Sequence, residues 1–194
     1  AVANCADIVE INHRPILDYL EKISGKKYGK NSDDTKAFRV VADHMKASVF
    51  LISDGVTPSN ADQGYYVRRM LRRAVRFSDA LGITESLLSG VVDSIADMYK
   101  EAYPDVSGKA SAVKKIIADE EKKFRETLSK GLKEFEKGTD PFILFTTFGF
   151  PFELTQELAK EKGKKVDEAK FRKDLEDHQS LSRAGAEQKF KGGL

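Results

Sequence analysis

The chain has 194 residues, of which 40% are hydrophobic and 33% are charged, and its formal net charge at pH 7 is +2. This composition is that of an ordinary globular protein with a proper core, and it excludes an intrinsically disordered chain. Because the chain is nearly neutral, any affinity for a polyanion has to come from local clustering of charge. A single cysteine, Cys5, excludes an internal disulfide framework and suits a reducing compartment, so we expect a cytoplasmic protein.

Membrane partners are not expected. No apolar run reaches the ~20 residues that span a bilayer, and the opening stretch AVANCADIVEINHRP does not read as a signal peptide. The chain begins without an initiator methionine, so we expect it to be a piece of something larger.

Apolar residues recur at three- and four-residue spacing along most of the chain, which predicts an all-α fold of about six to eight helices. The first helix is expected over 8–24, where Pro15 either begins a new turn or kinks the segment. A second helix, capped by Asp33 or Asp34, is expected to reach about Ser53.

The third helix follows a turn at Gly55 and Pro58, has Ser59 or Asn60 as its cap, and is closed by Gly82. Further helices are predicted from a Thr84 cap to about 98, and over 107–137, 155–163 and 166–182. We therefore expect one helical domain over 1–182, followed by a basic, glycine-containing linker over 183–194.

One segment breaks the helical pattern. The run PFILFTTFGFP, from Pro141 to Pro151, is rich in aromatic and β-branched residues. Its periodicity alone allows a short buried strand, so a short extended segment near 142–148 stays open beside the helical alternative.

The third helix concentrates positive charge on one side, and we call it the arginine helix. If Gly64 to Phe77 is helical, the apolar residues share one face: Val67, Met70, Leu71, Ala74 and Val75. At about 100° per residue, the five arginines fall on the other face: Arg68, Arg69, Arg72, Arg73 and Arg76. Guanidinium groups match phosphate oxygens and stay charged. A solvated helix back is the alternative, but such faces usually mix both signs, so the pattern favours a polyanion and a nucleic acid in particular.

Catalytic and metal-binding patterns are missing from the sequence. The histidines His13, His44 and His178 are far apart, and none has the spacing of a metal-binding pair. His44 borders an apolar stripe, which is more typical of a partly buried structural histidine than of a catalytic base. The acidic pair Glu120–Glu121 lies in a mixed-charge segment and is expected to be solubilising. The residues alone favour a binding module over a free-standing enzyme.

Three stretches resemble the alanyl-tRNA synthetase family, and their order and spacing fit it as well. They are FRVVADHMKASVFLISDGVTPSNADQGYYVRRMLRRAVRF at 38–77, LFTTFGFPFELTQELAKEKGKKVDEAKF at 144–171, and LSRAGAEQKFKGGL at 181–194. The resemblance implies that the intact protein is an alanine–tRNA ligase, a class II synthetase that uses ATP and Mg. It also implies that this chain is the helical domain that docks on the acceptor stem of tRNA(Ala), near a guanine–uracil wobble pair.

The resemblance implies which parts of the family pattern this chain lacks. In the family the aminoacylation core precedes the part that resembles this chain, and an editing domain with a zinc site follows it. We therefore expect no cofactor in this chain itself. Its expected partners are tRNA(Ala) and the aminoacylation and editing domains of the same polypeptide, towards the second of which the 183–194 linker would lead.

Two positions carry base recognition in the family. Asn60 matches the asparagine of the PSN motif, and its amide can read base edges in the shallow minor groove of RNA; the alternative role for Asn60 is a helix cap. The other position is the aspartate of a DTYGFP motif, where this chain has TTFGFP and therefore Thr146. A hydroxyl accepts hydrogen bonds without the charge assistance of a carboxylate. We expect weakened or altered recognition of the wobble pair, unless neighbouring groups compensate.

The arginines match the family's RR..RR pattern after GY. We expect contacts to the RNA backbone from Arg68, Arg69, Arg72, Arg73 and Arg76. One of them is open to pairing with a core carboxylate instead. Supporting roles fall to Ser59, to Gly64 through close backbone approach, and to Tyr65 through stacking or packing. The alternative function is a protein–protein or interdomain interaction module that uses the arginine helix.

Overall fold

The computed structural model describes residues 8–83 and 88–191, with side chains described for 13–83 and 88–181. These residues contain helices and no strand, which confirms the predicted all-α class. The helices are α1 (Ile8–Ser24), α2 (Ser32–Ser53), α3 (Asp62–Ala80), η1 (Leu88–Gly90), α4 (Val91–Tyr99), α5 (Pro104–Glu136), α6 (Pro141–Phe148), α7 (Phe152–Glu161) and α8 (Glu168–Lys191). The chain divides into two compact units, Ala1–Glu126 and Thr127–Leu194, and each is described by itself. The expected Thr84 cap lies outside the described residues.

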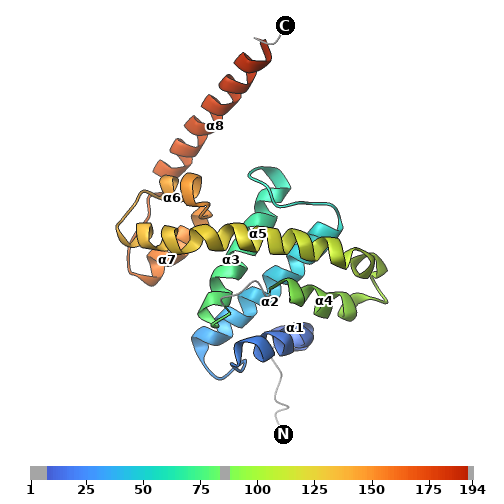
Figure 1. Cartoon of the computed structure of the whole chain (residues 1–194). Helices are drawn as coiled ribbons and strands as arrows, with labels where there is room; N and C mark the ends of the chain where they lie inside the picture. Colours follow the sequence, from blue (N-terminus) through green and yellow to red (C-terminus); the bar gives the residue numbers. More distant parts are fainter. Residues whose placement is uncertain (1–7, 84–87, 192–194) are drawn as a thin grey trace. The chain divides into compact units, whose positions relative to one another are not determined.

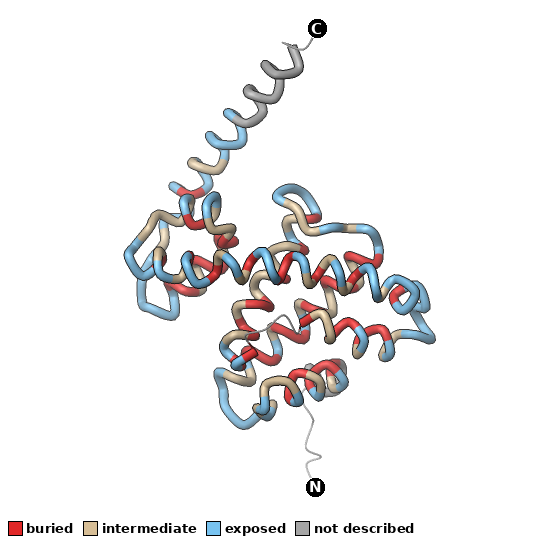
Figure 2. Tube along the Cα trace, viewed as in Figure 1, coloured by how far each residue is buried: buried red, intermediate tan, exposed pale blue. Residues whose placement is uncertain are grey.

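The first unit is built around α2 and α3, which form an antiparallel pair with the most extensive contact of any two helices (Figure 1). Buried positions recur along one side of each helix (Figure 2), because the apolar residues follow the helical period. Its largest fully buried side chains include Phe38, Met45, Leu81, Ile95 and Phe124. This core holds the arginine helix, now identified as α3, in place.

The start of α2 differs from the prediction. Its N-cap is Asn31, whose Oδ1 accepts hydrogen bonds from the backbone N of Asp33 at 2.8 Å and of Asp34 at 3.3 Å. Asp33 and Asp34 are therefore first-turn residues whose amides are capped, and the expectation that either is the cap was wrong. Asparagine at position 31 is an equally good cap.

The second unit begins within α5 and contains α6, α7 and α8. Residues 141–148 form α6, so the extended alternative for this segment was wrong. Strong end signals outweigh the aromatic composition: Asp140 Oδ1 accepts from Phe142 N at 2.8 Å, Pro141 takes the first turn, and Gly149 adopts a left-handed φ of 65° at the C-cap. Helix α8 extends to Lys191. The linker role of 183–194 stays a prediction.

Aromatic side chains form the core of the second unit. The rings of Phe152 and Phe171 stack with their centroids 4.1 Å apart. Phe150 is fully buried and lies directly against Gly131 of α5, where a Cβ would collide with its ring.

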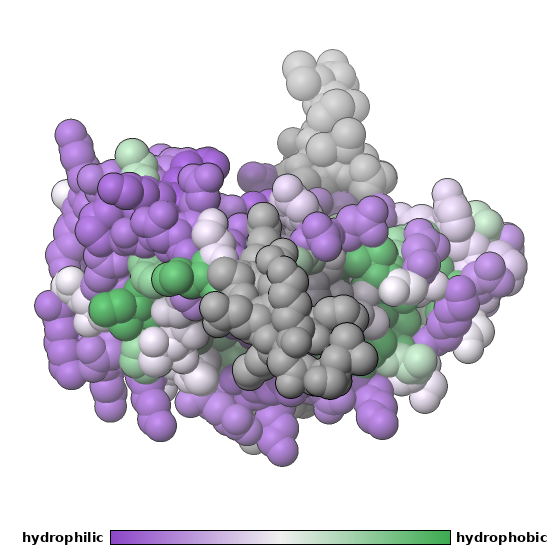
Figure 3. Space-filling model, turned by 90° about the horizontal axis from the view of Figure 1, so that it is seen from above, coloured by the Kyte–Doolittle hydropathy of each residue, from purple (hydrophilic) through white to green (hydrophobic). Residues whose placement is uncertain are grey.

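Most of the described surface seen in Figure 3 is hydrophilic, with small hydrophobic patches. In the part of the chain that the structure describes, no helix has the length and apolar character needed to cross a bilayer.

Candidate nucleic-acid interface

The five arginines of α3 lie in two rows with different surroundings, and not on a single solvated face. Arg68 and Arg72 form the α5 row, because both pair with a carboxylate of α5. The other three form the ring row, because each guanidinium lies over the ring of Tyr66 or Phe77: Arg69, Arg73 and Arg76. Arg72 also lies over a ring, that of Phe124, but its bond to Glu120 places it in the α5 row. Spacings of three and four residues keep the members of each row on one side of the helix.

The α5 row is held by Glu120. Arg72 Nε donates to Glu120 Oε1 at 2.7 Å, its Nη2 lies 2.6 Å from the same oxygen, and Arg68 Nε lies 3.2 Å from it. The side chains of Glu120, Arg72 and Arg68 are only 5%, 12% and 20% exposed. Burial lowers the pKa of Arg72, and the negative charge of Glu120 opposes that shift. This arrangement is a largely buried ion cluster. Pairing with a core carboxylate was left open for one arginine, and the structure shows it for two, Arg68 and Arg72.

Glu121, next to Glu120, is buried too. Its Oε1 lies 2.9 Å from Arg125 Nη2, and Arg125 also donates to Ser78 Oγ at 3.1 Å and pairs with Asp79. Burial raises the pKa of Glu121, while Arg125 acts in the opposite direction. The expectation that Glu120 and Glu121 are solubilising was therefore wrong: both carboxylates are buried against arginines, Glu120 against two arginines of α3 and Glu121 against Arg125 of α5 itself.

Arg68 also organises the loop that carries Asn60. Its Nη1 donates to Asn60 Oδ1, and its Nη2 donates to the carbonyl oxygen of Pro58 at 3.3 Å. The Asn60 side chain is exposed, and with Oδ1 engaged by Arg68 its Nδ2 remains a donor. The N-cap of α3 is Ala61, which makes no side-chain cap. Asn60 is therefore not a helix cap, and neither is Ser59, whose hydroxyl donates to Ala61 O at 2.7 Å.

The loop before α3 packs closely on the helix. Ser59 N donates to Gly64 O at 3.0 Å. A Cβ at Gly64 would collide with Thr57 O and Ser59 Oγ, so the close approach that glycine permits here is to the chain's own loop. Asp62 adopts a φ of 51°, a left-handed conformation that costs energy outside glycine and persists only where the surroundings impose it. These contacts fix the position of Asn60.

The ring row lies on the side of α3 that faces α2. Arg69 Cζ lies 5.2 Å from the ring centroid of Tyr66, and Arg73 Cζ lies 5.2 Å from that of Phe77. Arg73 Nη1 also contacts Nε2 of His44 at 2.7 Å. A guanidinium stacked on a ring keeps its charge, and its N–H groups point from its edge towards other acceptors.

His44 supports Arg73 as a neutral residue. Burial is the main cause that lowers the pKa of His44, and the charge of Arg73 adds to it, while a hydrogen bond with Asp43 acts against it. A neutral ring can accept from Arg73 at Nε2 and donate from Nδ1 to Asp43 Oδ2, 3.0 Å away. With a side chain 16% exposed, His44 fits the structural role predicted for it.

Tyr66 is the exposed aromatic residue of this region. A stacking or packing role was expected of Tyr65 from the sequence, and Tyr66 was missed. Tyr66 is 55% exposed, Tyr65 is half-buried, and their ring centroids are 5.9 Å apart. The available signal was spacing: Tyr66 precedes Arg69 by three residues, so a helix brings the two side chains together.

Thr146 belongs to the second unit and Asn60 to the first, so each is characterised within its own unit. Thr146 is exposed on α6, and its Oγ1 donates to Phe142 O at 2.9 Å. That bond uses the hydroxyl proton and leaves oxygen lone pairs as acceptors.

Comparisons with known proteins identify the family of the chain. The model of the family described as tRNA synthetases class II (A) matches residues 9–192. The chain is 42% identical over 194 residues to an alanine--tRNA ligase of Borrelia hermsii (strain HS1 / DAH), an alignment that covers 93% of this chain and 33% of the relative. It is 42% identical over 182 residues to an alanine--tRNA ligase of Staphylococcus aureus (strain JH9), covering 87% of this chain and 21% of the relative. The chain thus spans a third or less of the length of these relatives. Because the family model matches nearly all of it, the chain belongs to the class II tRNA synthetase (A) family.

Proposed function

We propose that this chain is the tRNA-binding part of an alanine–tRNA ligase and that it recognises the acceptor stem of tRNA(Ala). One observation carries the proposal: a helix with a row of ring-stacked arginines begins beside an exposed amide that Arg68 holds in place. The names of the relatives, all alanine--tRNA ligases, supply the identity of the RNA.

The two arginine rows are assigned different tasks. The ring row, Arg69, Arg73 and Arg76, binds backbone phosphates, because cationic contacts to phosphates provide affinity without sequence information. The α5 row is a positioning element: Arg72 is committed to Glu120, and Arg68 joins Glu120 to Asn60. This division refines the expectation that all five arginines contact RNA.

Base recognition is assigned to Asn60 and Thr146. The amide of Asn60 presents Nδ2 as a donor, which suits the base acceptors and 2′-hydroxyls of a minor groove. Thr146 presents acceptor lone pairs, which suit the guanine amino group that a wobble pair leaves without its usual partner. Since a neutral hydroxyl forms a weaker bond to that group than a carboxylate does, we propose that this protein prefers the guanine–uracil pair less strongly than a chain with aspartate at position 146.

Asn60→Ala tests the assignment. Acceptor-stem hairpins that differ only at the wobble pair would be bound to the 194-residue chain and followed by fluorescence anisotropy. We expect Asn60→Ala to reduce the affinity ratio between guanine–uracil and guanine–cytosine hairpins, and Arg69→Gln to weaken binding of both alike. Gln63→Ala is the matched control, because Gln63 is another exposed amide of the same segment. A ratio that survives Asn60→Ala intact would refute the role of Asn60.

The aminoacylation chemistry is proposed for parts of the protein other than this chain. The described residues contain no group of three His, Cys, Asp or Glu side chains that could hold a metal ion. No step that involves Mg, Zn or ATP is assigned to this chain. We propose that the remaining partners are the aminoacylation and editing domains of the same polypeptide, and that the protein acts in the cytoplasm.

A second candidate function has one observation in its favour. Arg68 and Arg72 already bind a carboxylate, Glu120, so the same helix is able to bind acidic groups of a partner protein or domain. Poly-glutamate separates the two functions: if it displaces a bound hairpin as effectively as unlabelled RNA does at equal charge, the interaction-module reading is favoured.

A further inference from the structure

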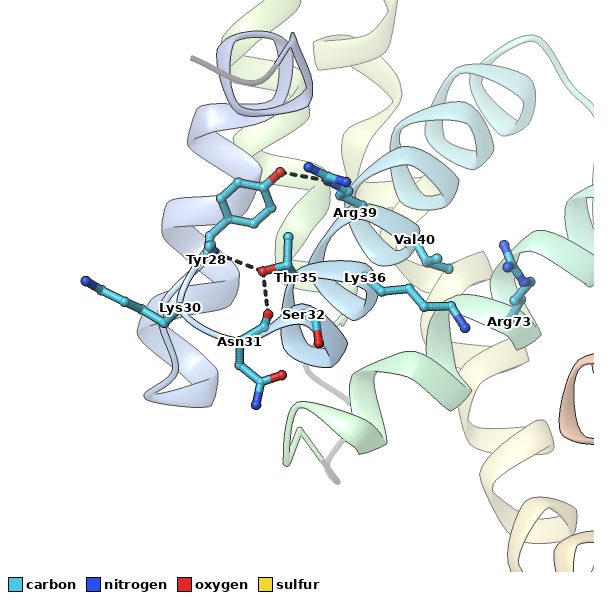
Figure 4. A pocket seen from close by; sticks show the side chains of 10 residues that line it. Tyr28, Lys30, Asn31, Ser32, Thr35, Lys36, Arg39, Val40 and Arg73 are labelled. Atoms are coloured by element: carbon cyan, nitrogen blue, oxygen red, sulfur yellow. Dashed lines mark hydrogen bonds between the residues drawn. The ribbon is translucent and has the colours of Figure 1, made fainter. Parts of the chain in front are cut away.

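A basic hollow lies where the start of α2 meets the second half of α3, away from Asn60 and its loop. Its volume is about 830 Å³, and it is lined by the turn before α2, the first turns of α2 and one residue of α3 (Figure 4). None of its lining residues is acidic, and four are cationic: Lys30, Lys36, Arg39 and Arg73.

Two of these cations approach each other from different helices. Figure 4 shows Lys36 reaching from α2 towards Arg73 of α3, whereas Lys30 points away from both. Lys36 Nζ and Arg73 Cζ each lie 5.2 Å from the ring centroid of Phe77, and Arg76 Cζ lies 4.8 Å from it. Three cations around one ring repel each other, and an anion bound between them relieves that repulsion.

The lining suits a phosphate better than an apolar small molecule. Small-molecule sites are lined mainly by apolar and aromatic side chains, but here only Tyr28 and Val40 are of those kinds. The floor is a fixed turn: Thr35 Oγ1 accepts from Gly29 N at 3.1 Å and donates to Asn31 O at 2.5 Å. The lining includes ammonium and guanidinium groups, which form the strong, charge-assisted bonds that phosphate oxygens accept.

Arg73 connects the hollow to the ring row, because it belongs to both. Along the row, Arg69 and Arg76 are roughly 10 Å apart at 1.5 Å of helix rise per residue. Lys36 and Arg39 extend this line of positive charge from α3 onto α2. A strand that follows the ring row would therefore continue into the hollow.

We propose that the basic hollow binds a backbone phosphate of the RNA strand that runs along the ring row, with Lys36 and Arg73 as the phosphate ligands. This inference rests on the proposed function and adds a contact on α2 that neither the arginine helix nor the family motifs indicate. Lys36 is its distinguishing residue, because Arg73 also serves the ring row.

Lys36→Gln in the 194-residue chain is the test, with a labelled acceptor-stem hairpin titrated at several salt concentrations. Loss of one phosphate contact flattens the slope of log affinity against log salt by about 1. Between 50 and 200 mM salt the variant should consequently lose about threefold less affinity than the unchanged chain. Lys46→Gln is the matched control, since Lys46 Nζ also lies over a ring, 5.0 Å from the Tyr99 centroid, but does not line the hollow; it should keep the original slope.

The outcomes separate this inference from the proposed function. If Arg69→Gln weakens hairpin binding while Lys36→Gln leaves affinity and salt slope unchanged, the hollow is not an RNA site and the proposed function stands. If the unchanged chain does not bind the hairpin, both proposals fail.

Competitors identify the source of the phosphate. Inorganic phosphate at matched ionic strength should not displace the hairpin; displacement that disappears in Lys36→Gln would show a site for free phosphate and overturn the RNA assignment. Displacement by poly-glutamate that depends on Lys36 would overturn it in favour of an acidic protein. Melting temperatures of Lys36→Gln and Lys46→Gln equal to that of the unchanged chain would show that the fold of both variants is intact.

Discussion

At the scale of single residues, Arg68 connects the loop of the proposed RNA interface to the interior of the fold. Its guanidinium joins Asn60 and Pro58 of the loop to Glu120 of α5. The amide that is proposed to read RNA is thus oriented by an ion cluster in the protein. Disturbing that cluster should lower the stability of the fold and, as a consequence, the selectivity for RNA.

Glu120→Gln tests the cluster. The substitution removes the carboxylate that the largely buried Arg68 and Arg72 share, so we expect a loss of about 3 kcal/mol in the free energy of unfolding. Urea denaturation measures it. Glu126→Gln is the control, since Glu126 is an exposed carboxylate of the same helix and its removal should cost less than about 0.5 kcal/mol. Equal costs for the two variants would mean that the cluster does not stabilise the fold.

His44 gives the chain a pH dependence of known sign. Its pKa in the folded state lies below the ordinary value of 6.5, chiefly because of burial. As pH falls, the unfolded chain therefore binds more protons at this residue than the folded chain does. Stability should therefore be constant above about pH 7 and fall as pH drops from about 6.5 towards 5.5, above the range where carboxylates titrate. Thermal melts of His44→Gln should lose this dependence. His178→Gln, at an exposed position, should retain it.

At the scale of helices, end signals decided more than composition did. The run at 141–148 is apolar enough for a strand, yet Asp140, Pro141 and Gly149 supply a cap, a first-turn residue and a left-handed terminus. Those residues stand in the sequence and could have settled the question. For the arginine helix, by contrast, the best local cap candidates at 59 and 60 are used elsewhere, which only the fold reveals.

Alanine substitutions at two glycines of α5 are expected to change the stability of the chain in opposite directions. Alanine has the higher helix propensity, so Gly108→Ala, which points into open space, should stabilise the chain by up to about 1 kcal/mol. Gly131→Ala should instead destabilise it by about 1–3 kcal/mol, because the added methyl collides with the buried ring of Phe150. Urea denaturation of both variants checks this, and a stabilising Gly131→Ala would contradict the packing described for the second unit.

At the scale of the whole molecule, the period of the apolar residues was sufficient to predict an all-α chain, and the α1 and α3 segments were located within a few residues. The pairing of charges across the fold was not predictable. The arginines and Glu120 are far apart in sequence, and nothing in either local pattern distinguishes a buried carboxylate from the exposed ones around it. The basic hollow was missed for the same reason, because it combines the start of α2 with Arg73.

The link from Glu120 through Arg68 to Asn60 has a consequence for natural variation. Three positions that lie on two helices and a loop share one geometry, so drift at any of them constrains the other two. Homologous chains should tolerate replacements there in concert and resist them singly, and loss-of-function alleles at position 68 would mimic damage to RNA reading while arising from a misplaced loop.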